Sequence, residues 1–174
     1  MAVLPIVVVP NPVLTRRAKE ITEIDERIRR LAQDMAETMY RAPGIGLAAN
    51  QVGELCRLIV VDVAYAYAEP HQKVKNPIIL INPKICLAEG EAVAEEGCLS
   101  VPDFGLEVAR SEQVRVEAVD LDGNPLVIEA DGLLARALQH EIDHLNGITI
   151  LEHASYLKRN IYTRKVKKKA RNTR

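Results

Sequence analysis

The chain has 174 residues, of which 48% are hydrophobic and 27% are charged, and its formal net charge is −1. These values are ordinary for one globular domain with a buried core. No apolar run approaches the roughly 20 residues that span a bilayer, and the first residues do not resemble a secretory leader. The three cysteines do not suggest a disulfide framework. We therefore expect a cytoplasmic protein.

The first half of the chain predicts one helix and two strands. Residues 22–40 form the expected helix, with Thr22 as its N-cap. Its apolar stripe consists of Ile24, Ile28, Leu31, Met35 and Met39. Pro43 and Gly44 end this helix. Residues 58–63 then predict a buried strand, the polar segment through Asn76 an exposed loop, and residues 78–82 a second strand.

The second half predicts a hairpin followed by a helix. Residues 114–119 alternate as a half-exposed strand does, and the turn at 122–125 leads into residues 126–128 as its partner. Residues 132–145 form the second helix, which stops at Asn146 and Gly147. The apolar run of residues 148–151 reads as a strand or extended segment. We therefore expect an α+β fold in which antiparallel strands surround a central helix.

That central helix carries a motif typical of metal-dependent hydrolysis. His140 and His144 are four residues apart, so both imidazoles lie on one helical face and can bind one metal ion. Glu141 stands beside them, where it can take a proton from water. The alternative is an amphipathic helix that carries two histidines by chance.

A catalytic metal usually has a third protein ligand. Downstream, Ile150 occupies the position where a metzincin-like pattern has its third histidine, Glu152 is too close in sequence, and His153 follows the apolar run that leaves the site. Upstream, Cys98 lies in a turn between a glycine and Pro102, where a thiolate can complete a Cys-His-His set. The other two thiols, Cys56 and Cys86, stand in apolar strand-like stretches, and we expect them to be buried.

Three segments together resemble the signature motifs of the peptide deformylase family. They are Gly44–Gln51 (Gly-Ile-Gly-Leu-Ala-Ala-Asn-Gln), Glu96–Ser100 (Glu-Gly-Cys-Leu-Ser) and Gln139–His144 (Gln-His-Glu-Ile-Asp-His), in the family's order. The resemblance runs from Leu4 to about Leu151, and we expect a catalytic domain over residues 1–157. It implies a hydrolase of protein biosynthesis that removes the N-formyl group from the formylmethionine of nascent polypeptides and releases formate.

The resemblance also implies how the site works. Cys98, His140 and His144 would hold one divalent metal, and Glu141 would act as base and then as acid. The Gln51 side-chain amide and the Leu99 backbone N–H would stabilise the negative charge on the formyl oxygen. The family commonly uses Fe2+, so we expect Fe2+ in the cell and Zn2+ or Ni2+ after aerobic purification.

A substrate pocket is expected beside the metal. Leu133 and Ala137 share the helical face of the two histidines, whereas Leu134, Leu138, Ile142 and Leu145 form a second stripe that reads as core. From spacing alone, Leu133 and Ala137 fit a methionine pocket and ordinary core equally well; the resemblance favours the pocket, with Ile45 as the opposing wall. Gly46 and Gly97 are positions where a peptide can approach the backbone closely. Arg136 lies between the stripes, and the sequence assigns it no role.

Residues 158–174 form a basic tail with nine Lys or Arg and no acid, so the remaining 157 residues carry 14 basic against 24 acidic side chains, about −10. Such a tail is usually a solvated, partly frayed end. The alternative is attachment to ribosomal RNA, because some deformylases dock at the ribosome by a C-terminal helix.

The chain departs from the family in two places. Many bacterial deformylases carry an arginine shortly after Pro102, but here the next one is Arg110, which puts substrate anchoring on that side in doubt. An aromatic residue common in relatives is replaced at Ile150 or Leu151, so we expect altered packing there.

Two other function classes remain open at this point. A small zinc endopeptidase would share the His-Glu-His helix, and an RNA-binding protein with a vestigial site would rest on the basic tail. Because Cys98, Glu141 and both histidines are all present, the deformylase interpretation is favoured.

Overall fold

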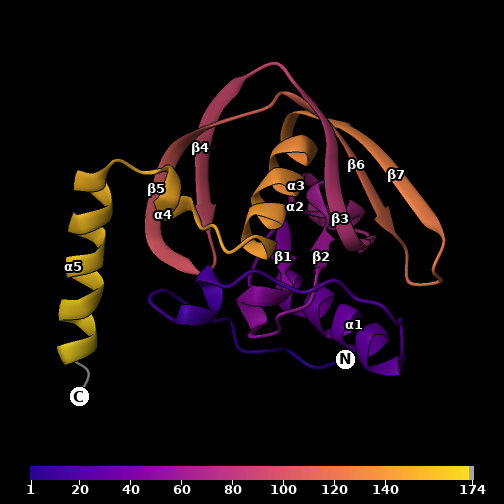
Figure 1. Ribbon diagram of the computed structural model, residues 1–174, viewed down its shortest axis with the longest axis horizontal. Helices are drawn as coiled ribbons and strands as arrows, with labels where there is room; N and C mark the ends of the chain where they lie inside the picture. Colours follow the sequence, from indigo (N-terminus) through magenta and orange to yellow (C-terminus); the bar gives the residue numbers. More distant parts are fainter. Residues whose placement is uncertain (173–174) are drawn as a thin grey trace.

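A helix, α3 (Gly132–Leu145), lies at the centre of the molecule, between a five-stranded antiparallel sheet and a two-stranded hairpin (Figure 1). The coordinates are a computed structural model that describes residues 1–172. The sheet has the order β1 (Gly46–Ala48), β2 (Leu58–Val61), β3 (Ile78–Glu89), β6 (Gln113–Val119) and β7 (Pro125–Asp131). The hairpin pairs β4 (Ala92–Cys98) with β5 (Val101–Arg110). The expected α+β fold around a central helix is confirmed.

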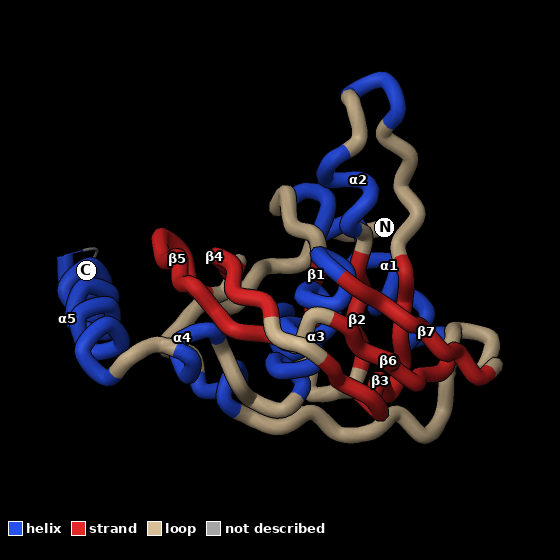
Figure 2. The backbone as a smooth tube through the Cα atoms, turned by 90° about the horizontal axis from the view of Figure 1, so that it is seen from above, coloured by secondary structure: helices blue, strands red, loops and turns tan. Residues whose placement is uncertain are grey.

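The remaining helices surround this core. They are α1 (Glu26–Arg41), α2 (Val63–Tyr67), α4 (Ile150–His153) and α5 (Tyr156–Asn172), with 3-10 turns at Pro12–Thr15, Ala49–Val52 and Pro70–Gln72. The segment that carries α2 projects away from the sheet (Figure 2). No helix among the described residues is long and apolar enough to cross a membrane.

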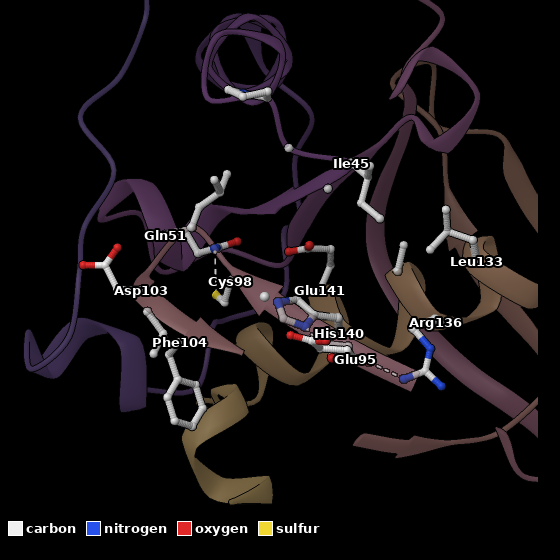
Figure 3. A pocket seen from close by; sticks show the side chains of 18 of the residues that line it. Ile45, Gln51, Glu95, Cys98, Asp103, Phe104, Leu133, Arg136, His140 and Glu141 are labelled. Carbon is white, nitrogen blue, oxygen red and sulfur yellow. Dashed lines mark hydrogen bonds and ion pairs between the residues drawn. The ribbon is translucent and has the colours of Figure 1, made fainter. Parts of the chain in front are cut away.

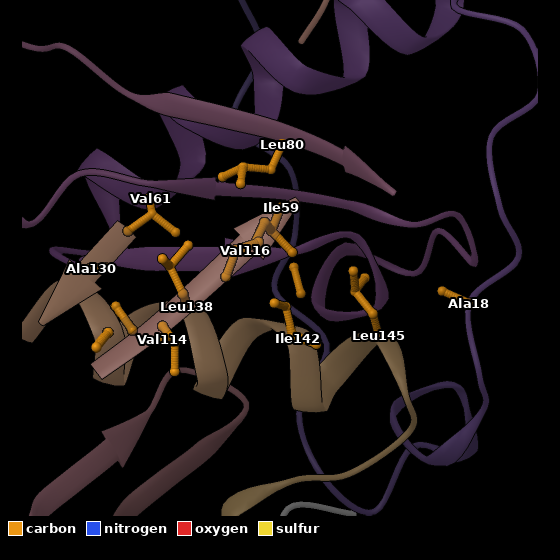
Figure 4. Close-up of a cluster of buried hydrophobic side chains, with 13 residues drawn as sticks. Ala18, Ile59, Val61, Leu80, Val114, Val116, Ala130, Leu138, Ile142 and Leu145 are labelled. Carbon is orange, nitrogen blue, oxygen red and sulfur yellow. The ribbon is translucent and has the colours of Figure 1, made fainter. Parts of the chain in front are cut away.

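Strand β2 shows why the sheet is covered on both faces. Ile59 and Val61 pack against Leu138 of α3, in a cluster to which the other four strands of the sheet also contribute (Figure 4). Leu58 and Val60 point the opposite way and pack with the apolar stripe of α1. Successive side chains of a strand face opposite sides, so a strand that is apolar throughout needs cover on both. The two clusters fix α3 against the sheet.

The first helix begins later than the sequence predicted. Its N-cap is Asp25, whose carboxylate accepts a hydrogen bond from the Ile28 backbone N–H at 2.9 Å, so Thr22 is outside the helix. Ile24 precedes the helix and still packs against its cluster. An Asp and a Thr are both good caps, and the one adjacent to the regular apolar stripe is used.

Two further expectations about local structure were wrong. Residues 150–153 form helix α4 rather than a strand, because Thr149 and Glu152 make a capping box: the Glu152 carboxylate accepts from the Thr149 N–H at 2.7 Å, and the Thr149 hydroxyl accepts from the Leu151 N–H at 3.3 Å. Cys86 was expected to be buried, but its thiol is exposed on β3 and donates to the Arg115 carbonyl.

The basic tail is a helix over most of its length. Helix α5 lies beside the hairpin, on the side away from the sheet (Figures 1 and 2). Tyr162 is buried, its hydroxyl donates to the Pro102 carbonyl at 2.7 Å, and its ring lies 4.9 Å from that of Phe104. Residues 156–172 are thus helical and are attached to the hairpin through Tyr162, while residues 173–174 lie outside the described part. The domain boundary at residue 157 stays a prediction.

Candidate metal centre

Three side chains bring one ligand atom each into a small space. Cys98 ends strand β4, and His140 and His144 lie one turn apart on α3. Their ligand atoms all lie within 4.8 Å of one another, and the Cys98 Sγ is 3.2 Å from the His144 Nε2. The hairpin and the helix are thus held so that the Cys98 sulfur faces two imidazoles.

Glu96 orients one of these imidazoles. Its Oε2 is 3.0 Å from the His140 Nδ1, so a proton on Nδ1 is shared with the carboxylate and Nε2 is the nitrogen left for a metal. Burial opposes ionisation of Glu96, but hydrogen bonds from His140 and Arg110 outweigh it and hold the pKa of this carboxyl well below its usual range. Glu96 is therefore an anion at the back of the site.

The donor set fits a divalent metal ion. Burial lowers the pKa of His144 well below its ordinary value, which keeps that imidazole neutral and its lone pair available. Burial also opposes a charge on His140, but hydrogen bonds to Cys98 and Glu96 raise its pKa to about 10. The site therefore favours a positive charge between Cys98 and His140, which a cation would supply in place of the proton. One thiolate and two imidazoles suit zinc and related transition metals.

Glu141 lies against the ligands without belonging to them. It is buried, its Oε2 has no hydrogen-bond partner among the described residues, and burial raises its pKa to about 7. Gly46 explains how it fits, because a Cβ there would lie 2.5 Å from the Glu141 Oε1 and 2.9 Å from its Cγ. The sequence predicted that Gly46 lets a peptide approach the backbone. In the structure its missing side chain also leaves room for the Glu141 carboxylate.

The expected oxyanion donors lie on the Cys98 side of the site. The Gln51 Oε1 accepts from the Ala48 N–H at 2.9 Å, which turns the amide so that Nε2 points to the Cys98 Sγ at 3.7 Å and the Ser100 Oγ at 3.2 Å. Leu99 lies in the turn between β4 and β5. Both residues line the same cavity as Cys98 and His140.

This cavity has a volume of about 540 Å³ and leads from Leu133 past His140 to Asp103 and Phe104 (Figure 3). The residues that the sequence suggested for a pocket all line it: Ile45, Gly46, Gly97, Leu133 and Ala137. The second stripe of α3 packs in the core, as expected, and Ala137 belongs to that core cluster as well as to the cavity wall. Tyr67, Glu95 and Arg136 also line the cavity, and the sequence did not predict them. Tyr67 lies on the short helix α2 and Glu95 on the β4–β5 hairpin, and neither element was predicted.

A buried ionic network behind the histidines was also missed. Arg110 donates to both oxygens of Glu96, at 2.9 and 3.0 Å, and also pairs with Asp143. Arg136 donates to the same Glu96 at 2.7 Å. Arg110 is therefore held behind the site, and the doubt about an arginine that anchors substrate on that side stands.

His153, the weaker candidate ligand, lies apart from the ligand group. Its Nε2 is 3.0 Å from the Asp143 carboxylate on the outer side of α3. Cys56 is partly buried, and burial raises the pKa of its thiol to about 11.

Comparison with known proteins agrees with this geometry. The family model for polypeptide deformylase matches residues 3–160. The chain is 47% identical over 172 residues to a peptide deformylase of Agrobacterium fabrum, covering 98% of each protein, and 50% identical over 169 residues to one of Thermodesulfovibrio yellowstonii, covering 97% and 99%. The crystal structure of the peptide deformylase from Ehrlichia chaffeensis superposes with a TM-score of 0.89 at 40% identity and covers 99% of each chain.

Proposed function

The chain belongs to the polypeptide deformylase family, and from that premise we propose how its own residues perform the reaction. It is a metal-dependent hydrolase that removes the N-formyl group from nascent polypeptides and releases formate. The observation that carries the residue-level proposal is that the buried Glu141 lines one cavity together with Cys98 and His140, two members of the Cys98, His140 and His144 cluster.

Cys98, His140 and His144 would hold a single divalent metal ion. When bound, such an ion lowers the pKa of a coordinated water and polarises an oxygen of the substrate. Glu96 supports this role, since it fixes which nitrogen of His140 faces the ligand group.

Glu141 moves the proton. It accepts a proton from the attacking water at its free Oε2, and it later delivers that proton to the departing amine, so that formate and a free N-terminus result. A pKa raised by burial to about 7 suits a group that must do both near neutral pH.

Gln51 and Leu99 stabilise the charge that develops on the formyl oxygen. The bond from the Ala48 N–H to the Gln51 Oε1 turns the amide so that its Nε2 faces the Cys98 side of the cavity, where the formyl oxygen would replace one of its present acceptors. The Leu99 N–H is the second proposed donor, from the turn that follows Cys98.

The substrate's methionine side chain occupies the apolar end of the cavity. Leu133 and Ala137 of α3 form one wall and Ile45 the other. Gly46 on β1 and Gly97 on β4 offer backbone groups to the peptide between these walls.

Formate release distinguishes this function from a peptidase. The anaerobic, Fe2+-loaded protein should release formate from formyl-Met-Ala-Ser and leave casein uncut. A Cys98→Ala protein should lose metal and activity together. Casein cleavage that survives this substitution would favour the endopeptidase, and metal-loaded protein that releases no formate would favour an RNA-binding role.

We propose Fe2+ as the working metal, with Zn2+ or Ni2+ after aerobic purification. A thiolate-bound ferrous ion should be sensitive to oxygen, so anaerobic preparations should contain more iron and be more active. Equal iron content and equal activity in aerobic and anaerobic preparations would refute this assignment.

Helix α5 is the proposed contact with ribosomal RNA, in a cytoplasmic protein. Its support is a solvent-exposed basic face that includes Arg164, Lys165, Lys167 and Lys168, on a chain whose remainder is acidic. Arg164→Glu with Lys168→Glu should abolish co-sedimentation with ribosomes at low salt. The charge-matched control, Lys84→Glu with Arg115→Glu, should leave it unchanged; equal binding by both double variants would refute the assignment.

A further inference from the structure

Arg136 connects the helix and the hairpin that carry the proposed metal ligands. It lies on α3, one turn before His140, and it is only 9% exposed. Its Nη1 donates to the Glu96 Oε1 at 2.7 Å and to the Val108 carbonyl at 2.9 Å, and its Nη2 donates to the Ala92 carbonyl at 2.7 Å. One guanidinium therefore binds both strands of the hairpin at once, and a dashed line marks its ion pair in Figure 3.

The ion pair reaches the metal site through Glu96. The Glu96 Oε1 takes hydrogen bonds from Arg110 and Arg136, and its Oε2 takes them from Arg110 and His140. Arg110 divides its charge between Glu96 and Asp143. Arg136 is thus one of two guanidiniums that hold the buried Glu96 carboxylate, and its loss would leave that carboxylate with one cationic partner fewer.

Arg136 also forms part of the cavity wall beside Ala137 and Leu133. Because its terminal nitrogens are held by the hairpin, the methylene stem is the apolar part left to face the cavity. Buried arginines commonly combine a fixed head group with a stem that packs like an aliphatic residue.

We propose that Arg136 is a positioning residue: its guanidinium locks Glu96, and through it His140, in the orientation that binds metal, while its stem walls the substrate cavity. This inference rests on the proposed function for the identity of the metal ligands. It does not require Arg136 to touch the reacting atoms.

The variants separate the two duties. Arg136→Met keeps an aliphatic stem and removes the hydrogen bonds, whereas Arg136→Ala removes both. Arg57→Met is the matched control, because Arg57 also bridges elements, with bonds to the Leu145 and Pro83 carbonyls and to Asn146, but contacts none of the ligands or Glu96.

The first readout is transfer of Zn2+ from the zinc-loaded protein to a chromophoric chelator. Arg136→Met should release zinc about 10-fold faster or more, as is typical when an outer partner of a metal-binding histidine is disturbed, and Arg57→Met should match the wild type. The visible spectrum of the Co2+-substituted protein should change in Arg136→Met and not in the control. If Arg136→Met does not fold, Arg136→Lys, which keeps a charge but cannot bridge both strands, takes its place.

The second readout is the split between kcat and KM for a formyl-Met peptide. Arg136→Met should lower kcat and keep KM near the wild-type value, while Arg136→Ala should also raise KM. Wild-type zinc release and an unchanged Co2+ spectrum in Arg136→Met would overturn the proposal. Because zinc release and the spectrum need no substrate, they remain decisive even if the protein releases no formate, which would instead refute the proposed function.

Discussion

Replacing Gly46 by alanine tests the position of Glu141 without touching Glu141 itself. The new Cβ would lie 2.5 Å from the Glu141 Oε1 and 2.9 Å from both its Cδ and its Cγ. Ordinary van der Waals contact begins near 3.4 Å, so the carboxyl must move by about 1 Å. Glu141 is buried, so the surrounding side chains leave it little room to move aside.

A displacement of about 1 Å at a reacting group can cost on the order of 10²-fold in rate. We therefore expect Gly46→Ala to lower kcat by about 10²-fold, which corresponds to about 2.7 kcal/mol of transition-state stabilisation. The metal content should stay at the wild-type level, because the three atoms nearest to the new methyl group all belong to Glu141 and none to Cys98, His140 or His144.

A double-mutant cycle with Glu141→Gln decides whether the loss passes through Glu141. If it does, Gly46→Ala should change the low residual activity of Glu141→Gln by much less than 10²-fold, because the two effects are not independent. An equal loss in both backgrounds would refute the reasoning and would show that Gly46 acts by contact with the peptide.

Three further outcomes follow from the same contacts. Cys98→Ala should lose its metal, so metal analysis after gel filtration should find much less than one ion per chain; full occupancy would remove Cys98 from the ligand set. Leu138→Ala should lower the free energy of unfolding, measured by urea titration, by about 2–5 kcal/mol, because Leu138 is fully buried against the sheet. The control Leu157→Ala, on the exposed face of α5, should change the free energy of unfolding by less than about 0.5 kcal/mol. Alkylation of Cys56, followed by mass spectrometry, should be slow at pH 8, where a pKa of about 11 leaves about one thiol in a thousand ionised. The rate should rise about tenfold per pH unit below that pKa. A rate at pH 8 equal to that of the exposed Cys86 would contradict this.

The elements that the sequence predicted best are those with strong local signals. Helix α3 begins and ends where its apolar spacing and the Asn146-Gly147 stop place it, because cap and periodicity agree. Strand β2 has an uninterrupted apolar run, and the β6–β7 hairpin has a turn at Asp120–Pro125 that fixes its register. In each case the local pattern and the tertiary packing favour the same structure.

The β4–β5 hairpin could not be predicted in the same way. Strand β4 is mostly exposed and reads Ala-Val-Ala-Glu-Glu-Gly-Cys, which lacks the alternation of a half-buried strand. Its position is set by Glu96, which binds Arg136 and His140 of α3, 40 and 44 residues further along the chain. Such long-range ionic contacts leave no periodic signal, so the sequence identified the metal ligands but not the network that orients them.

The most direct test of the proposed reaction is the rate of formate release by Glu141→Gln beside the wild type, both loaded anaerobically with Fe2+ and both analysed for iron. If Glu141 transfers the proton, both proteins should contain about one iron ion per chain, and Glu141→Gln should lose about 10²–10⁴-fold in activity, the range typical of removing a general acid–base group. A Glu141→Gln protein that keeps its iron and releases formate within tenfold of the wild-type rate would contradict the assignment of proton transfer to Glu141.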